Sequence, residues 1–241
     1  MNSTTHTTRP ATVDVAPRTA APATSRRWAW SGVAAGVAGI LSIGASMQVD
    51  AVYSPEAGGD PEKIVARLAE QVPAILTFHT ATMATVVLLL VFAAGLRRRL
   101  ADQLPSRSLL PEVAAAGLAL VSVAGLLGSG LTTEFVFGVS DPGDAIVPEA
   151  AVVFGHWVGT IPWLWVGAGV AGICVAVAAL RHGATARWVG WVGAVLGGVT
   201  LLLGISPLQY MAGMTGPVWL LVTALGLALG DRVTRARSGN V

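Results

Sequence analysis

The chain has 241 residues, of which 54% are hydrophobic and only 12% are charged, and its mean hydropathy is +0.68. A soluble globular domain carries about 25% charged residues. The composition therefore excludes a disordered chain, a nucleic-acid-binding arm and an ordinary soluble enzyme. The single cysteine, Cys174, lies in an apolar run, so the chain can form neither an internal disulfide nor a cysteine-based metal cluster.

Apolar segments long enough to cross a membrane recur along most of the chain. Residues 1–27 are rich in Thr, Ala, Pro and Ser, which predicts a disordered cytoplasmic tail. Each later apolar segment can cross ~30 Å of hydrocarbon at 1.5 Å per residue. We predict an all-α bundle of six transmembrane helices over 28–230, followed by a basic cytoplasmic tail at 231–241. The six spans are placed at about 28–48, 73–95, 111–132, 151–180, 187–206 and 211–230.

The loop after the first span carries the signals of a short helix. Asp60 can cap its N-terminus and Pro61 suits its first position. Ile64, Leu68 and Val72 recur every four residues and form one apolar stripe. We expect a short amphipathic helix that lies on the outer membrane surface or on the bundle.

The fourth span is longer than a membrane requires. About 30 residues correspond to ~45 Å of helix, so this segment must tilt, kink or protrude. Pro162 predicts a kink inside it, because proline removes a backbone donor and clashes with the preceding turn. The loop before it, at 133–150, contains Asp141-Pro142-Gly143-Asp144, which indicates a turn.

Basic residues are distributed asymmetrically between the two sides of this topology. With the N-terminus inside, 13 of the 15 Lys and Arg residues fall in cytoplasmic segments, and only Lys63 and Arg67 lie outside. The positive-inside rule counts these residues near the span ends. We therefore predict a cell-membrane protein with both termini in the cytoplasm.

Small residues repeat at four-residue spacing in several spans, which lets helix backbones approach each other closely. The pairs are Gly32 with Gly36, Gly155 with Gly159, Gly193 with Gly197, and Gly226 with Gly230. We interpret them as packing contacts inside the six-helix bundle, with self-association through one such face as the alternative.

Two histidines, His79 in the second span and His156 in the fourth, are the embedded ionisable side chains. An imidazole from each of two helices can ligate a b-type haem or, in the alternative, a copper or zinc ion. Depth argues against haem: His79 is ~27 Å along its helix from Arg97, whereas His156 is ~37 Å from Arg181. The favoured hypothesis is therefore a protein without a cofactor. His79 and His156 are candidate cofactor ligands in the alternative hypothesis of a haem- or metal-binding protein.

Hydroxyl groups near the histidines suggest a second kind of site. His79 with Thr80 and Thr82, if they face His156 and Thr160, would line a small polar cavity that opens outward and suits a small neutral ligand. Threonine hydroxyls in membrane helices more often bond to their own helix or join neighbouring helices.

The first span, the amphipathic helix, a second span ending in Gly95-Leu96-Arg97-Arg98-Arg99 and the Ala/Gly/Val-rich spans form one pattern. It resembles that of uncharacterised six-span membrane proteins of the actinobacterial type. The resemblance is one of architecture and composition over about residues 28–230, and it implies no activity.

The absence of a deeply embedded carboxylate argues against ion-coupled transport and intramembrane proteolysis. We therefore predict a non-enzymatic structural or accessory membrane protein that contacts the lipid bilayer and another membrane protein, and that binds no nucleic acid. The alternatives are a redox protein using His79 and His156, and a small permease component for a neutral or lipid-like solute.

Overall fold

The computed structural model describes residues 26–140 and 147–230, and within these residues the chain is helical and contains no strand. Six helical segments are long and apolar enough to cross a membrane, which confirms the predicted all-α architecture and suggests a membrane protein. The segments are Arg27–Ser46, Val72–Ala101, Leu110–Ser140, Pro148–His182, Arg187–Ile205 and Gln209–Leu229. Residues 1–25 of the predicted tail 1–27, the predicted tail 231–241 and the turn at 141–144 lie outside the described residues.

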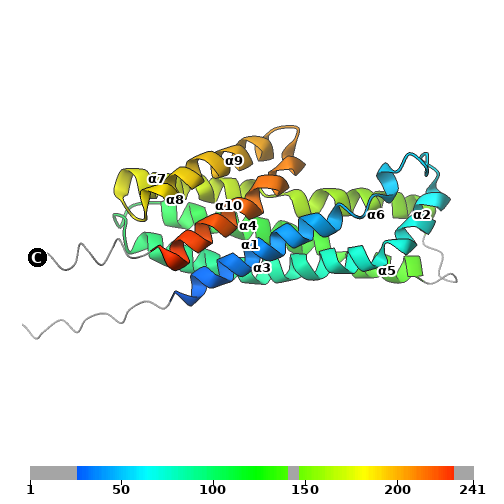
Figure 1. Cartoon of the computed structure of the whole chain (residues 1–241), viewed down its shortest axis with the longest axis horizontal. Coiled ribbons are helices and arrows are strands. Elements are labelled where there is room, and N and C mark those ends of the chain that lie inside the picture. The colour runs from blue at the N-terminus through cyan, green and yellow to red at the C-terminus, as the bar shows by residue number, and fades with distance from the viewer. Residues whose placement is uncertain (1–25, 141–146, 231–241) are drawn as a thin grey trace, which may run out of the picture.

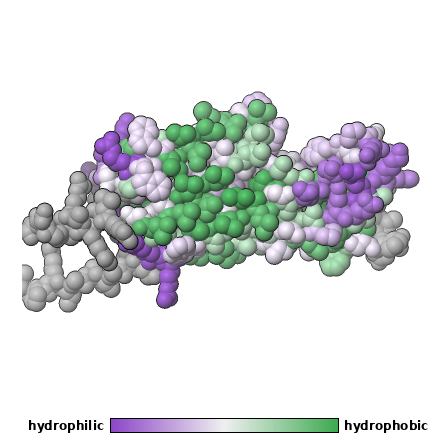
Figure 2. Space-filling view, in the orientation of Figure 1, coloured by the Kyte–Doolittle hydropathy of each residue, from purple (hydrophilic) through white to green (hydrophobic). Residues whose placement is uncertain are grey.

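The segments form one elongated bundle with chemically different ends (Figure 1). At one end lie the start of α1 (Arg27–Ser46), the end of α3 (Val72–Ala101) and the end of α10 (Ala212–Leu229). We call it the arginine end, because Arg27, Arg97, Arg181 and Arg187 stand at segment ends there. The opposite end is the distal end. A hydrophobic band covers the middle of the surface, and hydrophilic residues gather at both extremes (Figure 2).

Three of the six segments are too long for the hydrocarbon layer. They contain 30, 31 and 35 residues, against 19 to 21 in the others, whereas about 20 residues suffice. The extra residues of these three segments extend beyond the other segments at the distal end (Figure 1). There α5 (Thr132–Ser140) continues α4 (Leu110–Gly130), and α6 (Pro148–Thr160) precedes α7 (Val166–His182).

The projecting segments fold into a small unit with its own hydrophobic core, which we call the distal head. It consists of η1 (Ala51–Tyr53), α2 (Pro61–Glu70), α5, α6 and the first turns of α3. Its core includes Ile64, Leu68, Phe78, Val136 and Phe154, all buried. Phe135 and Phe154 stack with ring centroids 4.1 Å apart and planes 6° from parallel. This core is separate from the larger cluster that fills the rest of the bundle.

Helix α2 is the amphipathic helix that the sequence predicts between the first two spans. The side chain of Asp60 accepts hydrogen bonds from the backbone N–H groups of Glu62 and Lys63, and Pro61 occupies the first turn. Ile64 and Leu68 are buried on the other helices of the distal head, chiefly α6 and α5. The sequence allowed α2 to lie on the membrane surface or on the bundle, and in the structure it packs on the bundle.

The third and fourth segments differ in detail from the sequence prediction. Helix was expected to stop near residue 132, but the chain continues as α5 to Ser140, because Phe135 and Val136 pack in the core of the distal head. The expected break at Pro162 is confirmed. Helix α6 ends at Thr160, a 3-10 turn η2 (Ile161–Trp163) follows, and α7 begins at Val166.

The fifth segment consists of α8 (Arg187–Val192), a π-helical stretch η3 (Gly193–Gly197) and α9 (Gly198–Ile205). The sixth begins with the 3-10 turn η4 (Gln209–Met211) before α10. Cβ atoms placed on Gly172 of α7 and Gly197 of η3 would each lie 2.7 Å from the other's Cα. Only glycine permits this approach between the two backbones.

The predicted glycine pairs are used for packing inside the chain. Seven of the eight glycines face other segments of the same chain, and Gly230 faces the carbonyl of Gly226 in its own helix. Gly36, for example, faces the backbone of Leu221 on α10, and Gly32 faces Phe92 on α3. These contacts support the intrachain interpretation, and self-association stays a prediction.

Candidate functional site

The clearest candidate site is a cavity of about 540 Å³ at the base of the distal head, which we call the distal pocket. It lies where the end of α1, η1, η2 and the start of α10 meet. Its lining consists of Ser46, Met47, Val49, Asp50, Tyr53, Gly159, Thr160, Trp163, Tyr210, Met211 and Met214. Ligand pockets typically measure about 300–1,000 Å³ and combine an apolar or aromatic lining with a few polar groups.

Methionine and aromatic side chains give the distal pocket its character. Met47, Met211 and Met214 are three of the five methionines in the chain. Methionine is flexible and polarisable, so it adapts to apolar ligands of irregular shape. Tyr53 and Tyr210 add amphipathic rings, which favour the boundary between lipid and water.

The charge of Asp50 at the pocket wall is neutralised by the distal head. Arg67 of α2 donates from Nε to Oδ1 of Asp50 at 3.0 Å and from Nη2 to Oδ2 at 3.1 Å. Gln71 donates to the same Oδ1 at 2.6 Å, and Glu56 accepts a further bond from Arg67 at 3.1 Å. This two-point pairing between a guanidinium group and a carboxylate fixes α2 against the end of α1.

These contacts stabilise the ionised form of Asp50. The hydrogen bond from Arg67, followed by that from Gln71, lowers the pKa of Asp50 below its ordinary value of 3.8. The bond to Asp50 in turn raises the pKa of Arg67. Asp50 is therefore a paired carboxylate at neutral pH, so the pocket offers a ligand mainly apolar surface.

The floor of the pocket is the break in the fourth segment, where the helical hydrogen-bond pattern is interrupted. Three indole N–H groups connect this region to its surroundings. Trp163 donates to the hydroxyl of Ser46 at 3.0 Å and Trp157 donates to the carbonyl of Gly128 at 2.8 Å. Trp165 donates to the carbonyl of Pro162 at 2.9 Å. The break is thus a rigid junction with bonded polar groups rather than a frayed helix.

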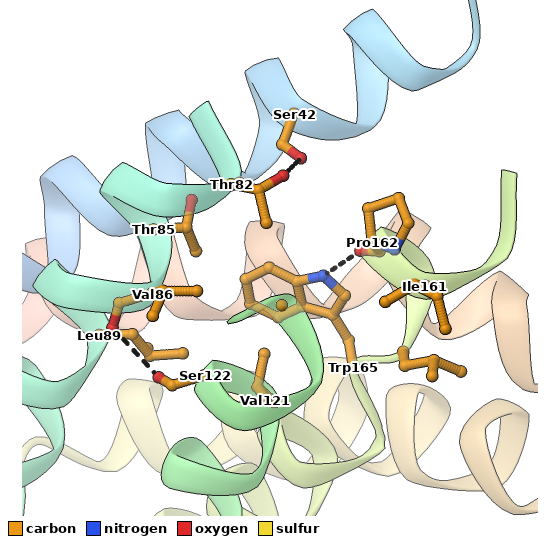
Figure 3. A pocket seen from close by; sticks show the side chains of 13 residues that line it. Ser42, Thr82, Thr85, Val86, Leu89, Val121, Ser122, Ile161, Pro162 and Trp165 are labelled. Atoms are coloured by element: carbon orange, nitrogen blue, oxygen red, sulfur yellow. Dashed lines mark hydrogen bonds between the residues drawn. The ribbon is translucent and has the colours of Figure 1, made fainter. Parts of the chain in front are cut away.

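A second, much smaller cavity also borders the break, at Ile161, Pro162 and Trp165 (Figure 3). Its volume of about 20 Å³ has room for one water molecule. Ser42 and Thr82 share a hydrogen bond of 2.7 Å beside it, and Ser122 donates to the carbonyl of Val86 at 3.2 Å. The indole ring of Trp165 extends toward these groups from the break (Figure 3). We call this space the central cavity.

The structure places the two predicted site residues in different surroundings. His156 is exposed on α6, where its ring meets Tyr53 edge-on at 5.5 Å between centroids. His79 is partly buried on α3, and its Nδ1 atom is buried without a hydrogen-bond partner. Neither histidine lines the distal pocket or the central cavity. Within residues 26–140 and 147–230, His, Cys, Asp and Glu side chains form no cluster of three or more that could hold a metal ion.

The polar cavity expected around both histidines is not assembled. Thr82 lines the central cavity, whereas Thr160 lines the distal pocket. Thr80 lies in a shallow hollow between α1 and α3. The expectation was wrong in this respect, because Thr160 packs with Tyr53 of η1 and Met211 of η4 at the distal pocket and not with Thr82 of α3.

Most residues of the distal pocket could not have been identified from the sequence. They come from three segments that lie far apart in the chain. The sequence features that pointed to this region were the kink at Pro162 and the two tyrosines, Tyr53 and Tyr210. They indicate the depth of the pocket along the bundle, but they do not indicate that a cavity exists there. No protein-family model, no curated protein and no solved structure matches the chain.

Proposed function

We propose that the chain is a non-enzymatic, multi-pass protein of the cell membrane that binds a neutral, lipid-like molecule in its distal pocket. The observation that carries this proposal is the size and chemistry of the pocket, about 540 Å³ lined by methionine and aromatic side chains. The one acid in its wall, Asp50, is paired with Arg67. An uncharged amphiphile suits this combination, because its apolar part replaces lipid contacts and its polar part meets Thr160 and Tyr53.

Binding is favoured over transport by the packing below the pocket. Between it and the arginine end the bundle is filled by one hydrophobic cluster that includes Phe92, Leu96, Trp219 and Leu220, all essentially inaccessible. A solute would need these side chains to separate before it could cross. The protein is therefore proposed to hold its ligand on one side, as an accessory to another membrane protein.

Photocrosslinking with a defined probe tests the proposed ligand class. Protein in lipid nanodiscs is illuminated with a diazirine-bearing diacylglycerol, and the crosslinked residues are mapped by peptide mass spectrometry. We expect labelling at Met211 and Met214 that excess unlabelled diacylglycerol removes. Labelling of Leu202, which is exposed on α9, is expected to resist competition because it reports bulk lipid.

A substitution that fills the pocket provides the control. Met214→Trp is expected to abolish the competable labelling, because the indole ring occupies the cavity. Val218→Trp, one helical turn further along α10 and outside the pocket lining, is expected to leave it unchanged. Equal labelling of Met211 and Leu202, with no competition at either, would refute the proposal.

The proposed orientation places the arginine end in the cytoplasm and the distal head outside. It is supported by the 13 basic residues assigned to that side, through the positive-inside rule. Cysteine introduced at Glu70, exposed on α2, is expected to react with an impermeant maleimide on intact cells. Cysteine at Asp102, exposed after α3, is expected to react only after lysis, and the reverse pattern would overturn the orientation.

A further inference from the structure

Helical serine and threonine hydroxyls in this chain usually bond to a carbonyl of their own helix. Thr82 donates to the carbonyl of Phe78 at 2.8 Å, and Thr85 donates to that of Ala81 at 2.9 Å. Such bonds to the residue four positions earlier are the ordinary choice for these side chains. A buried hydroxyl that does not make this bond therefore requires another explanation.

Among the described residues, Thr223 of α10 is one exception, and two more lie close together in the chain: Ser129, near the end of α4, and Thr132, at the start of α5. Their exposed fractions are 1% and 0%, and both hydroxyl oxygens are buried without a hydrogen-bond partner. Leaving a buried hydroxyl unpaired destabilises a fold, because the group loses its hydrogen bonds to water. Two neighbouring groups of this kind indicate that something outside the chain completes their hydrogen bonds.

The packing of α3 against α4 brings a third such atom to the same level. These helices are antiparallel neighbours: Ser122 donates to the carbonyl of Val86, and a Cβ on Gly125 would lie 3.4 Å from Cγ2 of Thr82. One helical turn further toward the distal end, the same register sets His79 of α3 level with Ser129 of α4. The Nδ1 atom of His79 is also buried and unpartnered.

We propose that His79, Ser129 and Thr132 form a hydrated site that holds water inside the bundle. A buried water molecule typically makes about three hydrogen bonds to protein groups that would otherwise be unsatisfied. The two hydroxyls and the imidazole nitrogen supply that number. All three groups can be neutral, so a neutral ligand such as water can bind them without a counter-charge.

This site extends the polar lining of the central cavity. Thr82 lies one turn below His79 and shares its hydrogen bond with Ser42, and Thr85 and Ser122 follow beside the cavity. From His79 to Thr85 the polar track runs six residues, or about 9 Å, along α3. It ends at Leu89 and Leu118, which are fully buried in the hydrophobic cluster. The polar track is therefore closed toward the arginine end by the hydrophobic cluster.

Solid-state NMR on histidine-labelled protein in bilayers tests the hydrated site. Magnetisation is transferred from water to the ¹⁵N nuclei of the imidazole rings, and the His79 signals are assigned by their loss in His79→Asn. We expect His79 to receive magnetisation from water although its Nδ1 has no exposed surface. His156, which is exposed, is the positive reference.

Two variants separate a specific site from general water penetration. Ser129→Ala combined with Thr132→Val removes two of the three proposed partners and is expected to abolish the transfer to His79. Ser122→Ala is the matched control, because that hydroxyl is already bonded to the carbonyls of Val86 and Leu118. A wild-type spectrum with transfer to His156 but none to His79 would overturn the proposal. That comparison needs only the His79→Asn variant, which assigns the signals.

Discussion

Trp163 and Ser46 join the break in the fourth segment to the end of α1, through a 3.0 Å hydrogen bond from the indole nitrogen to the hydroxyl oxygen. Both side chains are buried, and the two residues are 117 positions apart. They also form neighbouring parts of the distal-pocket wall. The geometry of the pocket therefore depends on this bond as well as on the packing of the helices.

Replacing Ser46 with alanine is expected to lower the free energy of unfolding by about 1–3 kcal/mol, because the indole N–H of Trp163 stays buried and loses its acceptor. The measurement is unfolding in mixed micelles as the fraction of denaturing detergent rises. Ser46→Ala combined with Trp163→Phe is expected to cost less than the sum of the two single changes, because the orphaned donor is removed as well. Strict additivity would show that the bond contributes nothing.

Acid is expected to release α2 from the end of α1. Because Arg67 and Gln71 lower the pKa of Asp50 below 3.8 in the folded protein, ionised Asp50 stabilises the fold at higher pH. That stabilisation is present above the unfolded-state pKa of about 4 and is lost as the pH falls through the lower, folded-state value. Thermal unfolding of wild type and Asp50→Asn, compared from neutral to strongly acidic pH, is expected to differ at neutral pH and converge in acid.

Glu56 provides the matched control for this pH effect. It also accepts a bond from Arg67, but 85% of its side chain is exposed, so solvent screens the interaction. Glu56→Gln is expected to change the pH profile much less than Asp50→Asn. A profile of Asp50→Asn parallel to that of wild type at every pH would contradict the assigned role of Asp50.

Patterns along the chain were sufficient to predict the spans and α2. Apolar runs and arginine flanks mark the spans, and Asp60 and Pro61 mark the start of α2. The break at Pro162 follows from its missing backbone donor. These features are local, because each depends on residues within one or two helical turns.

Features that depend on tertiary contacts were not predicted. Residues 133–140 were placed in a loop, but they belong to α5, where Phe135 stacks on Phe154. The distal pocket depends on how η1, η2 and α10 meet, and the hydrated site depends on the register between α3 and α4. His79 was a candidate from its residue type alone, but the buried, unpartnered hydroxyls of Ser129 and Thr132 become visible only in the folded structure.

The contact between α4 and α7 is expected to tolerate no side chain at Gly117. A Cβ at this position would collide with the carbonyl oxygen of Gly167, and a Cβ at Gly167 would collide with that of Gly117. Backbone atoms cannot move aside as a flexible side chain can, so Gly117→Ala is expected to destabilise the protein by about 1–3 kcal/mol. Unfolding in denaturing detergent measures the change.

Gly44, on the exposed side of α1, is the control because it has no atom of another segment within 4 Å of an added Cβ. Gly44→Ala is expected to be neutral or to stabilise the protein by up to about 1 kcal/mol, as alanine has the higher helix propensity. If both substitutions gave the same change, helix propensity rather than the α4–α7 contact would explain the effect.

Absorption spectra test whether His79 and His156 ligate a haem. We expect no haem band in the purified protein, oxidised or dithionite-reduced, even when haem is supplied during expression. The physical reason is that the two side chains lie in different surroundings: His156 is exposed on α6 against Tyr53, whereas the Nδ1 atom of His79 is buried on α3. Bis-histidine ligation requires both imidazoles to face one iron from opposite sides. A Soret band that disappears in both His79→Ala and His156→Ala would show that the helices rearrange around a haem, and the hydrated site would then have to be reconsidered.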